Sequence, residues 1–122
     1  MDANALRAMQ APVKERYKGE FCSGDMLLEA LVACAGVTVK AVATALDIPL
    51  KSGGVSAESD LDFRGTLGVA KDAPVGFAQI RLRFDLDTQD KLDQLVKLTE
   101  RYCVVCQTIK NSPWVDVKLA RL

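Results

Sequence analysis

Residues 26–46 read MLLEALVACAGVTVKAVATAL, and this stretch decides the fold. Its pattern predicts one helix from Met26 to Leu46 in which nearly every residue is apolar. Glu29, Ala33 and Lys40 share the one stripe that suits contact with water, since eleven residues make about three helical turns. A helix that is apolar on its other sides is covered by neighbouring elements. This helix is therefore predicted to form the core.

The residues that flank this helix set its expected ends. Ser23 is a suitable N-cap, and Asp25 suits the positive first turn. Ile48-Pro49 ends the helix, because the residue before a proline disfavours helical geometry. A domain of this size has difficulty burying such a helix on its own, which favours an interwoven homodimer.

Two segments after the helix alternate apolar and polar residues, as half-buried strands do. The first is 55–63 and the second is 77–87, and residues 64–76 between them form a predicted long turn. The outward side chains of the two strands carry opposite charges, which favours antiparallel pairing. The expected inward residues are Val55, Ala57, Leu61 and Phe63 in the first strand and Ile80, Leu82, Phe84 and Leu86 in the second.

A second long helix is predicted from a cap at Thr88, and the chain then closes with a strand at 114–120. One stripe of this helix carries its apolar residues and both later cysteines: Leu92, Leu95, Val96, Thr99, Cys103 and Cys106. The segment 5–17 also has helical spacing, with a kink at Pro12. This order of elements predicts an α+β fold, an antiparallel sheet packed with two long core helices.

Composition restricts the possible functions of the 122 residues, which we expect to form a single domain, 1–122. Lysine plus arginine equals aspartate plus glutamate at 16 each, so no net charge favours nucleic acid or an anionic membrane. Histidine is absent, which removes the commonest general base and metal ligand. The charged N-terminal segment lacks the apolar core of a signal peptide, which predicts a cytoplasmic protein. Its four cysteines are then expected to be reduced, redox-active or metal-bound and not permanently bridged.

The cysteines offer several interpretations. Cys34 lies between small residues that leave its sulfur accessible, although a buried cysteine often serves only as a small apolar residue. Cys103 and Cys106 form a C-x-x-C that fits a redox pair, half of a zinc site, or two core residues. Zinc is disfavoured, because Cys22 and Cys34 are not a second close-spaced pair. Thiols inside a helix also lack the helix N-terminus that lowers a thiol pKa.

Two motifs together point to a family. Residues 27–34 follow the form L-L-x-A-L-x-x-C, and residues 100–106 follow E-x-x-C-x-x-[SC] after a pair of strands. From Cys22 to Pro113 the chain resembles the OsmC/Ohr family of thiol peroxidases, of the organic hydroperoxide resistance type. The resemblance implies an interwoven homodimer in which Cys34 attacks the peroxide and Cys103 resolves the resulting sulfenic acid as a disulfide.

The chain departs from the family's pattern in two places. The family supplies an arginine from N-terminal strands, and here residues 1–21 form only a short arm before a core of 22–122, so Arg7, Lys14 or Arg16 would have to take that part. The family's acidic partner would correspond to Asp25, which also fits simple charge complementarity at the helix start. The family's Cys-Pro-x-Ser is Cys-Val-Val-Cys here, so Cys106 offers an alternative resolving thiol or none, and Cys22 is given no role.

The predicted activity is reduction of small organic hydroperoxides with an external dithiol and without cofactor or metal. Apolar side chains are candidates to line the pocket: Leu28, Leu31, Phe63 and Trp114. The alternative is a non-catalytic dimer of the same fold that senses redox state or binds an apolar ligand.

Overall fold

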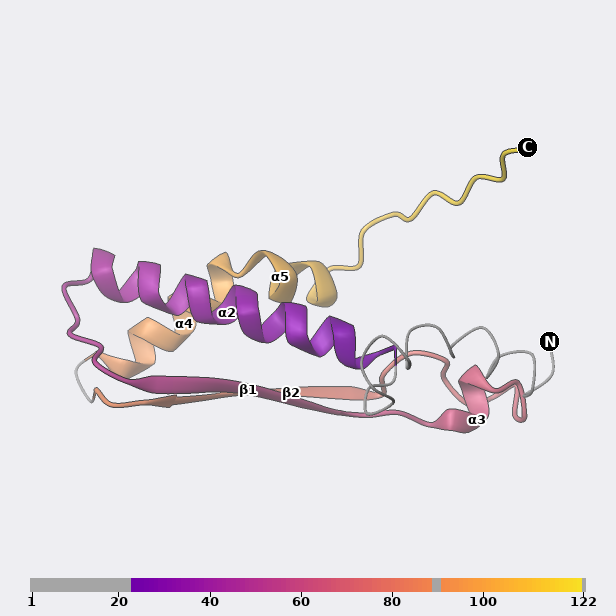
Figure 1. The fold of residues 1–122 in the computed structure, drawn as a ribbon, viewed down its shortest axis with the longest axis horizontal. Coiled ribbons are helices and arrows are strands. Elements are labelled where there is room, and N and C mark those ends of the chain that lie inside the picture. Colours follow the sequence, from indigo (N-terminus) through magenta and orange to yellow (C-terminus); the bar gives the residue numbers. More distant parts are fainter. Residues whose placement is uncertain (1–22, 89–90, 122) are drawn as a thin grey trace.

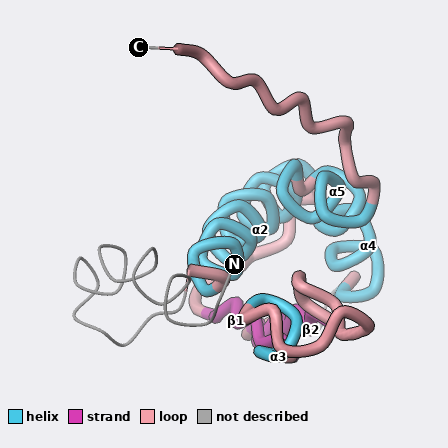
Figure 2. The backbone as a smooth tube through the Cα atoms, turned by 90° about the vertical axis from the view of Figure 1, so that its right-hand side faces the viewer, coloured by secondary structure: helices cyan, strands magenta, loops and turns pink. Residues whose placement is uncertain are grey.

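A computed structural model describes residues 23–88 and 91–121. The helix that decides the fold, α2 (Asp25–Ala45), runs along one face of a two-stranded antiparallel sheet of β1 (Gly53–Asp60) and β2 (Gln79–Leu86), as Figure 1 shows. Helices α4 (Leu92–Tyr102) and α5 (Val104–Lys110) pack beside α2, so that in the end-on view of Figure 2 the three helices lie on the same side of the sheet. The α+β prediction is confirmed.

The predicted core helix is found within one residue of its expected ends, but its cap differs. Gly24 is the N-cap of α2 and no side chain caps it, so the expectation for Ser23 is wrong. At the other end, Asp47 takes a left-handed conformation with φ 55°. The Ile48 amide then donates to the Ala43 carbonyl at 2.8 Å, and the Asp47 amide donates to the Thr44 carbonyl at 3.2 Å. This pair of bonds is a Schellman motif, so the helix is ended by its own C-terminal hydrogen bonds and not by Pro49.

Within a single chain α2 buries only one stripe: Leu31, Ala35, Val39 and Ala43. Its other apolar side chains stay partly or fully exposed, among them Leu27 at 41% and Val37 at 71%. By length and composition α2 is also apolar enough to cross a membrane, a test that the core helices of soluble proteins pass as well.

The two strands pair antiparallel, as the opposite charges of their outward side chains predict. Val55 lies opposite Phe84 and Ala57 lies opposite Leu82, with these side chains under the helices. On the outer face Arg81 bonds to Glu58 at 2.7 Å and to Asp60 at 2.8 Å. The opposite charges therefore do meet across the strand pair, although exposed pairs of this kind stabilise a protein only slightly.

Three predicted boundaries are wrong. The first strand ends at Asp60 rather than at 63, because Asp62 caps a one-turn helix, α3 (Phe63–Thr66), by accepting the Arg64 amide at 3.0 Å. The second long helix begins at Leu92 with Lys91 as its N-cap, not Thr88, and it breaks at Cys103 into α4 and α5. The predicted segment 5–17 lies outside the described residues.

The predicted closing strand at 114–120 is also wrong for a single chain. Residues 112–121 form no strand and extend away from the helices as the C-terminal segment in Figure 1. Its apolar side chains face solvent, with Trp114 exposed by 91% and Leu119 by 96%. Strand geometry requires a neighbour to satisfy the backbone groups, and the described part of the chain gives this segment none.

Candidate functional site

The candidate site forms where the helix break meets α2. Cys103 has an extended backbone, with φ −73° and ψ 111°, and serves as both the C-cap of α4 and the N-cap of α5. Its amide donates to the Thr99 carbonyl at 2.9 Å, which completes α4, and its carbonyl accepts from the Gln107 amide at 2.9 Å, which opens α5. The break therefore lies at the cysteine itself.

A second contact joins the two helices across this break. The side-chain amide of Gln107 donates to the Glu100 carbonyl at 2.9 Å. This carbonyl belongs to the last turn of α4, where no following helical amide is available to it. The bend is thus held by hydrogen bonds on both sides of Cys103.

Three thiols gather at this point. Cys103 and Cys106 are buried in one apolar cluster with Leu31 and Ala35 of α2, and Cys34 packs against that cluster. Cys34 is half-buried, whereas Cys103 is only 1% exposed. All three are free thiols in the structure. The structure thus brings together the two sulfurs that the sequence places 69 residues apart, 34 from 103.

The surroundings of Cys34 favour its thiolate. Interaction with the backbone N–H of Val105 is the largest influence that lowers the pKa of Cys34 below its ordinary value of 9.0. Burial opposes this shift, and the Cys103 thiol, the Val104 amide and the Thr38 hydroxyl add to it. The interaction between the two thiols lowers the pKa of Cys34 and raises the pKa of Cys103, so Cys34 ionises first.

The other two thiols shift the opposite way. Burial is the main reason that the pKa of Cys103 is raised, and the charge on Cys34 raises it further. Burial also raises the pKa of Cys106, with smaller contributions from the charges of Cys103 and Cys34. Since the thiolate is the nucleophile, the arrangement makes Cys34 the reactive sulfur and keeps its two neighbours protonated.

The amides that stabilise Cys34 were not predicted from the amino-acid pattern, which indicates one continuous helix and therefore no helix N-terminus near the thiols. The break at Cys103 supplies one, because the first amides of α5 have no helical carbonyl to bond. The second motif of the family that the chain resembles did contain a signal for this helix start. A proline after the second cysteine, as in the family's Cys-Pro-x-Ser, suits the first position of a helix, and so indicates that a helix begins at residue 104.

Of the remaining residues considered for the site, the structure describes only Asp25, and it does not join the thiols. Asp25 lies nine residues before Cys34 on α2, which is two and a half turns and therefore the opposite face of the helix. Arg7, Lys14, Arg16 and Cys22 lie outside the described residues.

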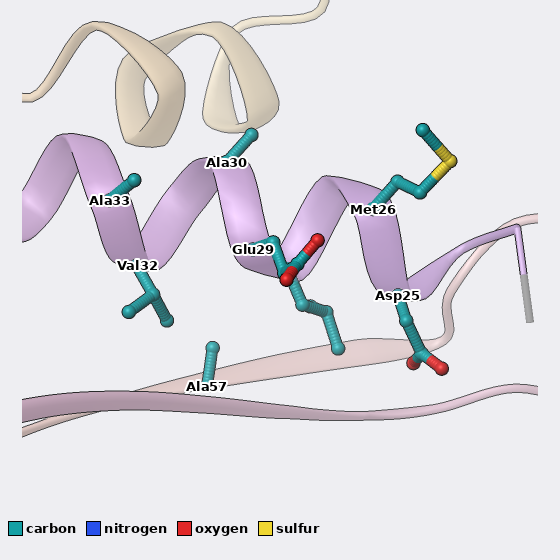
Figure 3. A pocket seen from close by; sticks show the side chains of 8 residues that line it. Asp25, Met26, Glu29, Ala30, Val32, Ala33 and Ala57 are labelled. Carbon is teal, nitrogen blue, oxygen red and sulfur yellow. The ribbon is translucent and has the colours of Figure 1, made fainter. Parts of the chain in front are cut away.

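Figure 3 shows where Asp25 lies instead, at one end of an open hollow of about 740 Å³ between α2 and β1. Leu28 lines the same hollow, in which Val32 and Ala57 point toward one another.

Of the four predicted apolar wall residues, only Leu31 lies with the thiols. Phe63 lines a different pocket near α3, and Trp114 is on the exposed C-terminal segment. A cavity of about 290 Å³ opens beside Cys106. It is bounded by Leu31, by three side chains of β2 and by residues of α4 and α5: Ile80, Leu82, Phe84, Val96, Glu100, Ile109 and Lys110. Among residues 23–88 and 91–121, no group of three His, Cys, Asp or Glu side chains is placed to hold a metal ion.

Comparison with protein families decides the relationship. The family model described as OsmC-like protein matches residues 16–118. The chain belongs to the OsmC-like family. OsmC-like proteins are associated with peroxiredoxin-like resistance to hydroperoxides and are generally soluble. No curated protein matches this OsmC-like chain.

The lowered pKa of Cys34 in this OsmC-like chain predicts its pH dependence. Because the thiolate fraction reaches one half at the pKa, the midpoint of the pH profile for alkylation of Cys34 by iodoacetamide is expected below pH 9.0. The midpoints for Cys103 and Cys106 should lie above that pH. Mass spectrometry of the labelled peptides measures all three profiles.

Two proline variants test the cause of this shift. Val105→Pro removes the leading N–H, so the midpoint of Cys34 should move toward 9.0. Val104→Pro is the matched control, since it follows an extended residue, as proline prefers, and removes the smaller contribution. Equal midpoints in the two folded variants would contradict the assignment.

Proposed function

We propose that this chain is a thiol-dependent hydroperoxide reductase in which Cys34 attacks and Cys103 resolves. The Cys34 thiolate forms a bond to one peroxide oxygen, the O–O bond breaks, and the alkoxide leaves and takes up a proton as the alcohol. Cys34 is then a sulfenic acid. The Cys103 thiol condenses with it, forming the disulfide and releasing water, before further oxidation destroys the nucleophile. An external dithiol reduces the disulfide and completes the cycle.

The main support for this proposal is that two backbone amides, of Val104 and Val105, and the Cys103 thiol all interact with the Cys34 sulfur. The amides of Val105 and Val104 stabilise the Cys34 thiolate, which a peroxidase needs in its resting state. The Cys103 thiol interacts with the same sulfur and packs in the same cluster, which supports its role as the resolving group. The amides support the thiolate in the way that the family's arginine would.

The surroundings of the thiols favour an apolar substrate. Cys34 packs on a cluster whose partly buried members are apolar, and the cavity beside Cys106 is walled by Leu31 and by Ile80, Leu82 and Phe84 of β2. Apolar walls exclude water and favour an organic peroxide over hydrogen peroxide. We therefore propose small organic hydroperoxides as the substrate class, and the cytoplasm as the compartment, where thiols stay reduced.

The test is dithiol-dependent consumption of cumene hydroperoxide by the reduced full-length protein, followed by mass-spectrometric mapping of its thiols. Turnover should exceed the rate with dithiol alone, and the first oxidised residue should be Cys34. Oxidation without steady turnover would instead support the alternative, a redox-sensing protein of this fold. No oxidation of Cys34 would contradict both.

We also propose that two copies form an interwoven homodimer, because the single chain leaves apolar surface of two kinds uncovered. The open hollow on α2, lined by Leu28, Val32 and Ala33, has no cover within the described residues. The alternating segment 114–120 extends from the domain with its apolar residues exposed, yet the family match continues to residue 118. Each strand of the described sheet also has one unpaired edge, which a strand from a second copy would satisfy.

The C-terminal segment offers a matched pair of variants to test the dimer. Val117 is 87% exposed in the single chain, so Val117→Asp would cost a monomer almost nothing. If a second copy covers Val117, the same change buries a charge, and sedimentation should shift from dimer to monomer. Lys118→Asp, on the opposite side of the extended segment, should remain dimeric. A monomeric parent protein would contradict the proposal.

A further inference from the structure

The Cys-Val-Val-Cys motif lies at the start of α5 and not within a continuous helix. Cys103 is the N-cap, and Cys106 is the third residue of the helix. Residues three apart at a helix start have Cα atoms about 5 Å apart. A disulfide accepts Cα separations of roughly 4.4 to 6.8 Å. The extended backbone of Cys103 also frees its side chain from the helical direction.

Cys106 belongs to the same buried cluster as Cys103 and contacts the same apolar surface of α2. The hydroperoxide reductase mechanism proposed above does not use it. A third thiol one turn from a catalytic disulfide has a definite chemical option, which is exchange with that disulfide.

We propose that Cys106 takes the disulfide over from Cys34, so that the Cys103–Cys106 bond is the form that the external dithiol reduces; this rests on the proposed reductase function. In this step the Cys106 sulfur forms a bond to the Cys103 sulfur and the Cys34–Cys103 bond breaks. The Cys106 thiol loses its proton to solvent, and Cys34 leaves as a thiolate. The number of disulfides is unchanged, so the exchange needs no oxidant.

The direction of the exchange follows from the leaving group. A thiol of lower pKa leaves faster, and attack on the Cys103 sulfur expels Cys34, whose pKa is the lowered one. The first disulfide also removes the charge on Cys34, which is one of the causes that raise the pKa of Cys106. Cys106 is therefore protonated before the peroxide reacts and becomes easier to ionise afterwards.

Access for the reductant favours the same order. Cys103 is 1% exposed and Cys106 is 8% exposed. Cys106 also lines the cavity of about 290 Å³, at whose rim Glu100 and Lys110 form an ion pair. An external dithiol can approach Cys106 through this cavity, whereas Cys103 does not line it.

The experiment maps disulfides in the full-length reduced protein after one equivalent of cumene hydroperoxide, without reductant. The parent protein should hold the Cys103–Cys106 bond with Cys34 free to alkylate, and Cys106→Ser should hold Cys34–Cys103. Cys106→Ala repeats the test should the hydroxyl disturb the core, and Cys22→Ser is the matched control that should behave as the parent does. Far-ultraviolet circular dichroism checks that each variant folds.

A second equivalent of peroxide gives an independent readout. Because exchange returns a free Cys34, the parent should consume about two equivalents and Cys106→Ser about one, with dimedone trapping sulfenic acid on Cys34 only in the parent. A Cys34–Cys103 bond that persists in the parent would overturn the exchange but leave the reductase intact. If neither parent nor Cys106→Ser oxidises Cys34, the reductase proposal has failed, and the exchange fails with it.

Discussion

Replacing Cys34 by serine is expected to reduce the consumption of cumene hydroperoxide to the rate of the dithiol alone. Serine fits the same half-buried position but its hydroxyl does not ionise near neutral pH, so the amides of Val104 and Val105 have no thiolate to stabilise. The measurement is the rate of peroxide loss at a fixed protein concentration. Cys22→Ser should retain the parent rate, because we give Cys22 no role. Equal rates for the parent protein and Cys34→Ser would refute the assignment.

Cys103→Ser separates attack from resolution. Cys34 should still react with the first equivalent, since the leading influence on its pKa, the Val105 amide, is unchanged. Without the neighbouring thiol, repeated exposure to peroxide should convert Cys34 to sulfinic and sulfonic acids, which mass spectrometry detects. A Cys103→Ser protein that turns over as the parent does would show that another thiol resolves Cys34.

Leu95→Ala is expected to lower the free energy of unfolding by about 2 to 5 kcal/mol. Leu95 of α4 is completely buried in a cluster with Val39 and Ala43 of α2 and Ile48 of the following turn. Truncation there leaves a cavity between the two helices that carry the thiols. Denaturation by urea at fixed protein concentration measures the loss, which is a large part of the stability of a small domain.

Leu92→Ala is the control for this prediction. It makes the same truncation on the same helix at a side chain that is 39% exposed, so a smaller loss is expected. A Leu95→Ala protein no less stable than Leu92→Ala would contradict the described packing of α4 on α2.

Periodicity predicted the elements that pack on a partner within the chain. The apolar run of α2 is long enough to fix its ends within one residue, and the alternation of β1 and β2 gave the inward residues, such as Val55 and Phe84. The segment 114–120 alternates equally well yet forms no strand here. Alternation indicates which residues are apolar on one side, but strand formation depends on a neighbour that the pattern does not identify.

The sequence was enough to predict that the Cys34 and Cys103 sulfurs lie close together, but not which groups shift their pKa values. The two family motifs were enough to place Cys34 near Cys103. The helix break at Cys103 was not expected, because Leu92, Leu95, Thr99, Cys103 and Cys106 continue a single stripe across it. Apolar spacing shows which side of a helix faces the core, but it does not reveal a single extended residue within that helix. The free amides of Val104 and Val105 could therefore not be predicted.

The bond from Gln107 to the Glu100 carbonyl has a consequence for how this region moves. It ties the last turn of one helix to the first turns of the next, so a swing of α5 away from α2 has to break it or carry α4 along. The glutamine takes no part in the proposed redox steps. Disulfide formation and exchange at residues 103 and 106 can therefore proceed while the angle between α4 and α5 is kept.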